Sequence, residues 1–254
     1  MQHRESPRAT GAGLLAEDPA ALKRIAPWTP VKAKTGKAGV EVGVWGRTYR
    51  FAGAPLPTSV ETAGEEILAA PVRLAGRENG KPLEWKTGGA RLFGRTHSAA
   101  VVTGWQMCGG FIANTAARIE FDGLMRVDLT LMPQKGAASA LEQLWLEIPL
   151  RRDKAGLYHF WPGEWGSAGN SGALPGTGLN LPFKPFVWLG WEDGGLGWFA
   201  ESDQGWRPQD DNAAIEVAAG GDGTVLRLRL LDAPPPRLPV TFTFGFQATP
   251  VKPW

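Results

Sequence analysis

Apolar and polar residues alternate along most of the chain after residue 36, and this alternation predicts β-strands. Between Val40 and Val44 the apolar residues occupy even positions, whereas from Trp45 to Phe51 the large side chains occupy odd positions. Successive side chains of a strand point to opposite faces, so the change of parity predicts a β-bulge near residues 44–46.

The clearest alternation runs from Arg118 to Leu131, where odd positions are apolar and even positions are mostly polar. A two-residue turn at Asp122-Gly123 would pair residue 119 with residue 126, which sets an apolar face against a polar one. The pattern therefore predicts one long strand that contains Gly123, with one buried face and one solvated face.

Shorter alternating segments follow along the rest of the chain. They span Leu144–Leu150, Ile215–Val217, Thr224–Leu230 and Val240–Ala248. Two further runs, Phe186–Trp191 and Leu196–Glu201, flank a loop with two glycines, which predicts a hairpin. Helical periodicity is nearly absent, and no repeat of about 20 to 50 residues is visible. We therefore expect an all-β fold, namely a large two-sheet antiparallel β-sandwich.

Residues 1–36 differ from the remainder and predict a mobile leader. Within them, Asp18 and Pro19 are a favourable N-cap and first-turn pair, so Ala20–Ile25 is expected to form a short helix. Residues 37–254 are expected to form the sandwich domain. The first residues hold no apolar segment typical of an export signal. Either the protein is cytoplasmic, or this chain is a piece of a longer protein that is secreted or periplasmic.

The composition agrees with a turn-rich β fold and argues against several functions. Among 254 residues, 34 are glycine and 21 are proline, dispersed along the chain. The net charge of +2 with scattered basic residues argues against nucleic acid as a partner, and no apolar run reaches the about 18 residues of a membrane helix. Three separated histidines and one cysteine predict neither zinc nor disulfides, and no cofactor motif is present. Cys108 is expected to be a small buried group.

Half of the 12 tryptophans lie within residues 161–206, which is the most distinctive feature of the sequence. Alternation on the expected hairpin means that some of these rings point away from the core. An outward indole presents a flat apolar face that suits a pyranose ring, and neighbouring acids can accept hydrogen bonds from its hydroxyls. The alternative is a bulky core with a satellite cluster of aromatic side chains.

Acidic side chains in the same region offer a second kind of chemistry. Glycoside hydrolysis needs two carboxyl groups about 5 to 9 Å apart, one of them protonated. Glu192 and Asp193 are expected in a solvated turn. Glu201, which is followed by Asp203, is either a functional acid or an anchor for the loop that follows. His159, at a strand end, is expected to be structural or solvent exposed.

Four strings of residues carry a family resemblance. They are Val44–Tyr49, Ile119–Asp128, Phe186–Gly190 leading to Gly197–Ser202, and Gln247–Pro253. In this order they resemble the amino-terminal region of large bacterial proteins similar to glycoside hydrolase family 123. The resemblance spans about Val40 to Trp254 and is most specific from Trp198 to Trp206.

In such proteins, the segment similar to Ala248–Pro253 leads into a separate barrel that carries the catalytic carboxylates. The resemblance therefore implies a non-catalytic accessory β-sandwich, with no catalytic residue in this chain and with carbohydrate or the barrel as its partner. The residues favoured for that contact are Trp188, Trp191, Trp198, Glu201 and Trp206, together with Trp161 and Trp165.

Two other functions stay open at this point. A self-sufficient polysaccharide-cleaving enzyme would pair Glu201 with Asp203, Asp193 or Glu164 as acid and base in a cleft of the sandwich. An interaction module would instead bury its exposed aromatic side chains against a partner domain. Either function would leave the expected fold class unchanged.

Overall fold

The computed structural model describes residues 28–134, 141–163, 168–220, 223–235 and 237–252. These residues form twenty β-strands and three short 3₁₀ turns, and they include no α-helix. The all-β fold class is thereby confirmed. The helix expected at residues 20–25 lies outside the described residues, as does Trp165. The described end of the expected leader already contains a strand, Lys32–Gly36.

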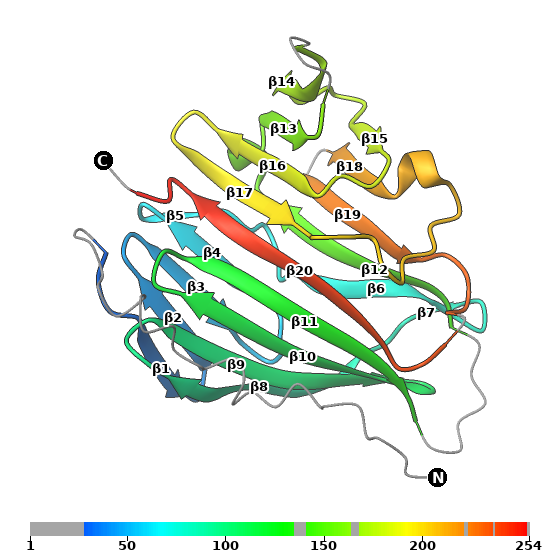
Figure 1. The fold of residues 1–254 in the computed structure, drawn as a ribbon, viewed down its shortest axis with the longest axis horizontal. Coiled ribbons are helices and arrows are strands. Elements are labelled where there is room, and N and C mark those ends of the chain that lie inside the picture. Colours follow the sequence, from blue (N-terminus) through cyan, green and yellow to red (C-terminus); the bar gives the residue numbers. More distant parts are fainter. Residues whose placement is uncertain (1–27, 135–140, 164–167, 221–222, 236, 253–254) are drawn as a thin grey trace.

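The largest sheet has nine antiparallel strands and faces the viewer in Figure 1. It begins at a short edge strand and ends at a ten-residue one. In spatial order its strands are β14 (Ser171–Ala173), β13 (Leu157–Trp161), β16 (Phe186–Trp191), β17 (Gly194–Phe199), β20 (Val240–Thr249), β11 (Leu124–Pro133), β10 (Phe111–Glu120), β9 (Ala99–Cys108) and β8 (Lys86–Arg95).

Two smaller antiparallel sheets complete the domain. The six-stranded sheet has the order β15 (Leu179–Leu181), β18 (Ile215–Gly220), β19 (Gly223–Leu231), β12 (Leu141–Leu150), β6 (Arg73–Glu78) and β7 (Lys81–Pro82). The five-stranded sheet has the order β1 (Lys32–Gly36), β2 (Gly39–Val44), β3 (Arg47–Phe51), β4 (Ser59–Thr62) and β5 (Glu65–Glu66).

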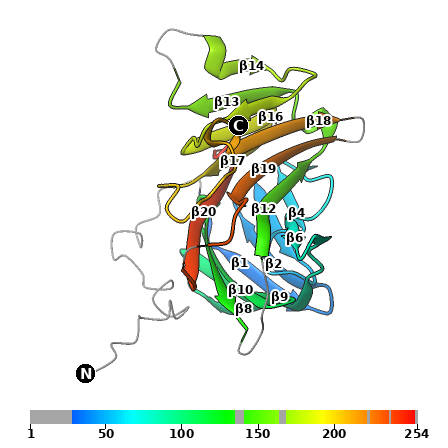
Figure 2. The ribbon, with the colours of Figure 1, turned by 90° about the vertical axis from the view of Figure 1, so that its right-hand side faces the viewer.

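The three sheets form two layers. Figures 1 and 2 show the nine-stranded sheet as one layer, and the two smaller sheets together as a second layer against one of its faces. One continuous apolar core lies between the layers, with Val127 and Phe244 from the first and Tyr49 and Leu146 from the second. The expected sandwich therefore has a divided second layer. Its two sheets are linked where Leu68, which follows β5, forms a bridge with Leu150 of β12, with flanking backbone bonds from Ala69 to Pro149 and from Arg151 to Ile67.

The segment from Arg118 to Leu131 is a hairpin, so the prediction of one long strand was wrong. β10 and β11 are joined by the three-residue turn 121–123, in which Gly123 has a φ of 82°. A three-residue turn pairs Ile119 with Met125, odd with odd, so both apolar faces stay on one side of the sheet. The mismatch of apolar and polar faces therefore excludes a two-residue turn at Asp122-Gly123, but it does not exclude a hairpin with a three-residue turn.

The parity change near residue 45 also reflects a turn, and the predicted bulge was wrong. β2 and β3 form a hairpin whose two-residue turn, Trp45-Gly46, pairs Val44 with Arg47. Gly46 has a φ of 75°, a conformation that glycine adopts without strain. A two-residue turn pairs even with odd positions, which explains the switch. The hairpin predicted from Phe186 onward is confirmed, with Glu192-Asp193 as its turn.

Arg47 joins the five-stranded sheet to the end of β20. Its side chain is 2% exposed, and its guanidinium donates to the carbonyl oxygens of Trp45 (3.2 Å), Ala248 (3.2 Å) and Val251 (2.7 Å). A buried guanidinium is costly unless its N–H groups are paired. The three carbonyls therefore pair with the two terminal nitrogens of Arg47, whereas its buried Nε has no partner among the described residues. They also hold the backbone at residues 248–251 against the second layer.

Tyr49 makes a second buried polar contact across the layers. Its hydroxyl donates to the carbonyl oxygen of Gly123 at 2.6 Å, in the β10–β11 turn. Close by, the Thr62 hydroxyl donates to the carbonyl oxygen of Thr249 at 3.2 Å. The first bond connects the five-stranded sheet to the β10–β11 turn, and the second connects it to the end of β20. Together they fix the relative position of the two layers at this end.

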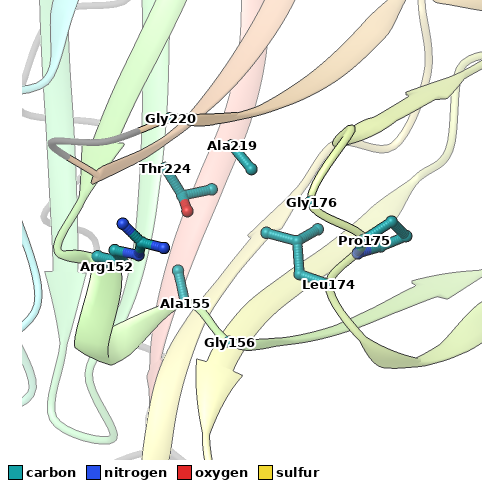
Figure 3. Close-up of a pocket in the computed structure, with 9 residues that line it drawn as sticks. All are labelled: Arg152, Ala155, Gly156, Leu174, Pro175, Gly176, Ala219, Gly220 and Thr224. Carbon is teal, nitrogen blue, oxygen red and sulfur yellow. The ribbon is translucent and has the colours of Figure 1, made fainter.

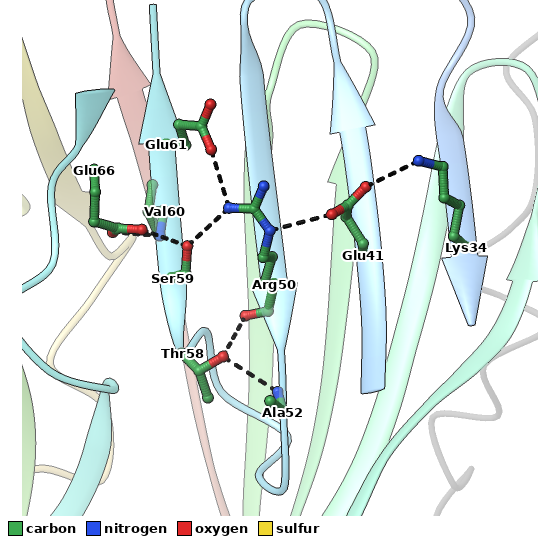
Figure 4. Close-up of polar contacts among 9 residues, drawn as sticks. All are labelled: Lys34, Glu41, Arg50, Ala52, Thr58, Ser59, Val60, Glu61 and Glu66. Carbon is green, nitrogen blue, oxygen red and sulfur yellow. Dashed lines mark hydrogen bonds and ion pairs between the residues drawn. The ribbon is translucent and has the colours of Figure 1, made fainter. Parts of the chain in front are cut away.

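The outer face of the five-stranded sheet is charged (Figure 4). Arg50 pairs with Glu41 at 3.1 Å and with Glu61 at 3.0 Å, and Lys34 also pairs with Glu41 at 3.4 Å. Solvent-exposed pairs of this kind contribute about 0–1 kcal/mol each. Their main effect is to keep this face solvated, so that the apolar residues of the same strands face the core.

We predict that Tyr49→Phe lowers the free energy of unfolding by about 1–3 kcal/mol, because the buried carbonyl of Gly123 loses its donor. Urea unfolding at neutral pH measures this loss. Tyr158→Phe is the matched control, since that hydroxyl bonds an exposed carbonyl, Gly169, at 3.2 Å. Equal losses in the two variants would show that the Tyr49 bond has no special role.

We also predict an alkaline effect that depends on Tyr49. Burial raises the pKa of Tyr49 from 10.0 to about 12. The unfolded chain therefore loses this proton first, and the stability it contributes is complete below pH 10 and disappears as pH rises through 12. The wild type should lose about 2–3 kcal/mol more than Tyr49→Phe between these pH values. Parallel curves of unfolding free energy against pH would contradict the prediction.

Candidate functional site

A cavity of about 400 Å³ lies beside the tryptophan-rich hairpin. Its walls come from the segment before β16 and from the long loop between β17 and β18. The lining residues are Pro182, Phe183, Asp203, Trp206, Pro208, Asp211 and Ala214. We call this the Trp206 cavity.

Backbone hydrogen bonds hold the loop that forms the Trp206 cavity. The amide of Trp206 donates to the carbonyl of Asp203 at 2.9 Å, which closes a turn with Gly205 at a φ of 87°. The next residue, Arg207, exchanges backbone bonds of 2.8 Å with Leu230 and Asp232 at the end of β19. The loop is therefore fixed to the six-stranded sheet, and the tryptophan has a defined place.

Aromatic packing orients the ring of Trp206. Its centroid lies 5.4 Å from that of Phe183 in an edge-to-face arrangement and 5.9 Å from that of Trp198. Trp198 is fully buried, whereas Trp206 and Phe183 are half-buried. The buried indole thus supports two rings that present part of their surface to the cavity.

Carboxylates give the same cavity its charge. Asp203 and Asp211 both line it and are both exposed. Neither forms an ion pair within the described ranges. Asp211 begins a 3₁₀ turn, Asp211–Ala213, that is capped by the preceding Asp210, whose carboxylate accepts from the amide of Asn212 at 2.8 Å. The cavity combines aromatic surface with free hydrogen-bond acceptors.

Trp198 cannot contact a ligand in this structure, because its side chain is 0% exposed. The two-residue turn of the hairpin pairs Val187 with Trp198, which puts Trp198 on the core face, although Trp188, also an even position, lies on the outer face. Equal parity on two strands therefore does not mean the same face. Trp198 was therefore wrongly included among the residues expected to contact carbohydrate or a barrel.

Trp188 and Trp161 lie on the outer face of the nine-stranded sheet. The indole N–H of Trp188 donates to the Thr249 hydroxyl at 3.0 Å, and its ring lies over Gly190 and Gly195, where any side chain would collide with it. Trp188 is thus held flat against the sheet and is half-buried. Trp161, near the sheet edge, is 43% exposed and presents more of its ring.

The remaining predicted residues are dispersed. Trp191 is half-buried, with the ammonium of Lys154 4.5 Å from its ring centroid. Glu201 is exposed and does not line the Trp206 cavity, and the turn there is closed by the Asp203 carbonyl instead. Glu192 and Asp193 form the exposed hairpin turn, as predicted. Glu164, like Trp165, lies outside the described residues.

His159 and Cys108 have structural surroundings. The Nδ1 atom of His159 lies 2.7 Å from the Ser171 hydroxyl oxygen on the neighbouring strand. Cys108 is buried, as expected, and burial raises the pKa of its thiol. Its sulfur lies 3.8 Å from a carboxylate oxygen of Glu78. A raised pKa keeps the thiol protonated and makes it a poor nucleophile.

A second cavity, of about 470 Å³, lies where β19 meets the turn that contains Arg152 (Figure 3). Small residues such as Ala155 and Gly176 surround Arg152 and Thr224 there, and no aromatic ring lines it. Within the described part of the chain, no three His, Cys, Asp or Glu side chains gather as a metal site. Among these same residues, no helical segment has the length and apolarity needed to cross a bilayer.

Trp206 and Asp203 were identified from the sequence, whereas Asp211, the second carboxylate of the cavity, was not. Asp211 is eight residues beyond Asp203, and only the backbone bonds at Arg207 bring the two sides of the loop to one cavity. The spacing of acids around a lone tryptophan in a proline-containing loop was the available signal. Trp105, 42% exposed on β9, was also missed, because it lies far from the tryptophan cluster in the sequence.

The described residues define a β-sandwich domain with an aromatic, acid-lined surface cavity. A family model for the third domain of glycoside hydrolase 123 matches residues 37–174, which is more than half of the chain. The chain belongs to this family and is a glycoside-hydrolase-associated domain, which confirms the resemblance. The family model describes a third domain, whereas the four strings resembled an amino-terminal region.

None of the curated proteins compared with the chain matches it. Among solved structures, a β-arabinopyranosidase has a TM-score of 0.49 and 14% identity, covering 79% of this chain and 38% of that protein. A copper-containing benzylamine oxidase from Hansenula polymorpha has a TM-score of 0.47 and 7% identity, with coverages of 87% and 61%. The Slr1438 protein of Synechocystis sp. PCC 6803 has a TM-score of 0.43 and 10% identity, covering 86% of this chain and 95% of that protein. The chain spans less than two thirds of the length of the first two.

Proposed function

We propose that this chain is a non-catalytic accessory domain of a glycoside-hydrolase-like protein and that it binds carbohydrate in the Trp206 cavity. The observation that carries the proposal is the meeting of two half-exposed aromatic rings and two carboxylates in one cavity of about 400 Å³. Ligand pockets of about 300–1,000 Å³ are typical for small molecules, so a cavity of this size accommodates a sugar unit.

The chemistry of a sugar ring matches this lining. A pyranose has C–H groups on its faces, which pack on an indole or phenyl ring, and hydroxyl groups around its edge. Asp203 and Asp211 have carboxylate oxygens that accept hydrogen bonds from such hydroxyls. Trp198 supports the binding ring from below, so that little side-chain entropy is lost when a sugar stacks on Trp206.

The positions of the acidic residues favour binding over hydrolysis. Hydrolysis requires a carboxyl pair that flanks the scissile bond. Among the described residues considered for that pair, Asp203 alone lines the Trp206 cavity, whereas Glu201 lies outside it and Asp193 is at the hairpin tip. Within the described lining of this cavity, Asp203 and Asp211 are the carboxyl pair that a self-sufficient enzyme would use, and the experiment below detects such an activity.

A second role, support of a following catalytic barrel, is favoured by the buried contacts of Arg47. All four strings that carry the family resemblance meet near the end of β20. Arg47 binds the carbonyls of Ala248 and Val251, and Trp188 binds the hydroxyl of Thr249. The Gln247 amide also donates to the carbonyl of Asp122 at 3.1 Å. This arrangement would hold a segment that leads into a barrel in one direction.

Affinity electrophoresis of the purified chain in gels that contain cellulose derivatives, xylan, arabinan or galactan tests the binding proposal. We expect retardation by at least one polymer. Trp206→Ala should weaken it about tenfold, because the stacking surface is lost, and Asp203→Asn with Asp211→Asn should weaken it without touching the core. Thermal unfolding shows whether each variant is folded.

Trp161→Ala is the matched control, since it removes an exposed indole from another face. Loss of retardation in Trp161→Ala but not in Trp206→Ala would place the site on the outer face and contradict the cavity assignment. New reducing ends that disappear in Asp203→Asn would identify the chain as an enzyme. No retardation on any polymer would leave docking to a protein partner as the function.

A further inference from the structure

A groove of about 600 Å³ on the outer face of β8–β11 is distinct from the Trp206 cavity and shares no residue with it. It contains an exposed indole and several polar side chains. The groove is lined by Gly88, Gly89, Arg91, Thr103, Gly104, Trp105, Asn114, Thr115, Ala116, Asp128, Thr130 and Met132. We propose that this groove binds an anionic saccharide, one that carries a carboxylate or a sulfate group.

The ring of Trp105 is held in place by an irregularity of the neighbouring strand. The pairing of β8 with β9 shifts between Thr87 and Ala90, and Gly89 has a φ of 78°. A Cβ atom at Gly88 would lie 2.2 Å from the indole of Trp105, so only glycine permits the ring to lie against this strand. The ring is nevertheless 42% exposed. It is therefore a positioned apolar surface in contact with solvent.

Strand register places polar side chains next to this ring. Asn114 is opposite Trp105 on one side and Thr130 on the other, so the three form one row across the sheet. The Asn114 amide has only a weak contact within the described residues, 3.9 Å to the sulfur of Met132. Its hydrogen-bonding groups are thus available to hydroxyls of a ring that lies on the indole.

The next row gives the groove its positive charge. Arg91 is opposite Thr103, two residues from Trp105 and on the same face. Arg91 is exposed and forms no ion pair or hydrogen bond with another described residue. The carboxylate of Asp128 in this row already accepts from the Thr243 hydroxyl at 2.7 Å and from Arg126 at 3.3 Å. Arg91 is therefore the free charge of the groove.

An indole beside a free guanidinium suits a particular class of sugar. The ring face of the sugar packs on Trp105, and its anionic group pairs with Arg91, which can donate two parallel hydrogen bonds to a carboxylate or sulfate. A neutral sugar would leave Arg91 without a partner. The charge of the groove distinguishes its ligand from that of the acid-lined Trp206 cavity.

Affinity electrophoresis with three polymers tests this proposal, namely polygalacturonate, dextran sulfate and neutral galactan. We expect retardation by one of the anionic polymers and about tenfold weaker retardation in both Trp105→Ala and Arg91→Gln. The polymer that is bound identifies the anionic group. Phe93→Ala and Lys86→Gln are matched controls on the same strand, because they remove an exposed ring and an exposed charge outside the groove.

Several results would overturn the proposal. They are retardation by neither anionic polymer, equal retardation by galactan, or equal losses in Lys86→Gln and Arg91→Gln, which would indicate non-specific attraction. Trp206→Ala separates this proposal from the previous one, because it should leave binding of the anionic polymer unchanged. Binding that is lost only in Trp206→Ala would overturn the groove and leave the Trp206 cavity intact.

Discussion

The nine-stranded sheet has only one face to bury, and this constraint determines where every aromatic side chain of the sheet lies. Its inner face closes the apolar core against two smaller sheets, and its outer face meets solvent. Because side chains alternate along a strand, the register of each hairpin decides which rings become core and which become surface. Trp198 and Trp188 are close in space and lie on opposite faces for this reason.

Polar contacts inside the domain supply the directional constraints that apolar packing lacks. Apolar surfaces attract one another without strict direction, whereas a buried guanidinium or hydroxyl is stable only with specific partners. Arg47 and Tyr49 each reach carbonyl oxygens far away in the sequence. These contacts align the two layers and fix the position of the end of β20. The aromatic surface residues lie beside this end of the strand.

Strand content could be predicted from the sequence because period-two alternation reports burial directly, as from Val240 to Ala248. The hairpin turn at Glu192-Asp193 could also be predicted, but the turns at Gly46 and Gly123 could not, since two- and three-residue connections differ only in which parity they pair. The same uncertainty of register put Trp198 among the surface candidates. Trp206 was found because it lies in the aromatic cluster, whereas Asp211 and Trp105 reach their cavities through strand pairing and backbone bonds distant in sequence.

We propose that partly exposed indoles beside polar groups bind sugars, while Trp198 is part of the scaffold. Indole N–H signals in a ¹⁵N–¹H correlation spectrum report each tryptophan separately during titration with cello-, xylo-, arabino- and galacto-oligosaccharides. We expect the Trp206 signal to shift with at least one of them in a saturable manner, and the Trp198 signal to shift least among the tryptophans of the cluster. No saturable shift at Trp206 with any oligosaccharide would contradict it.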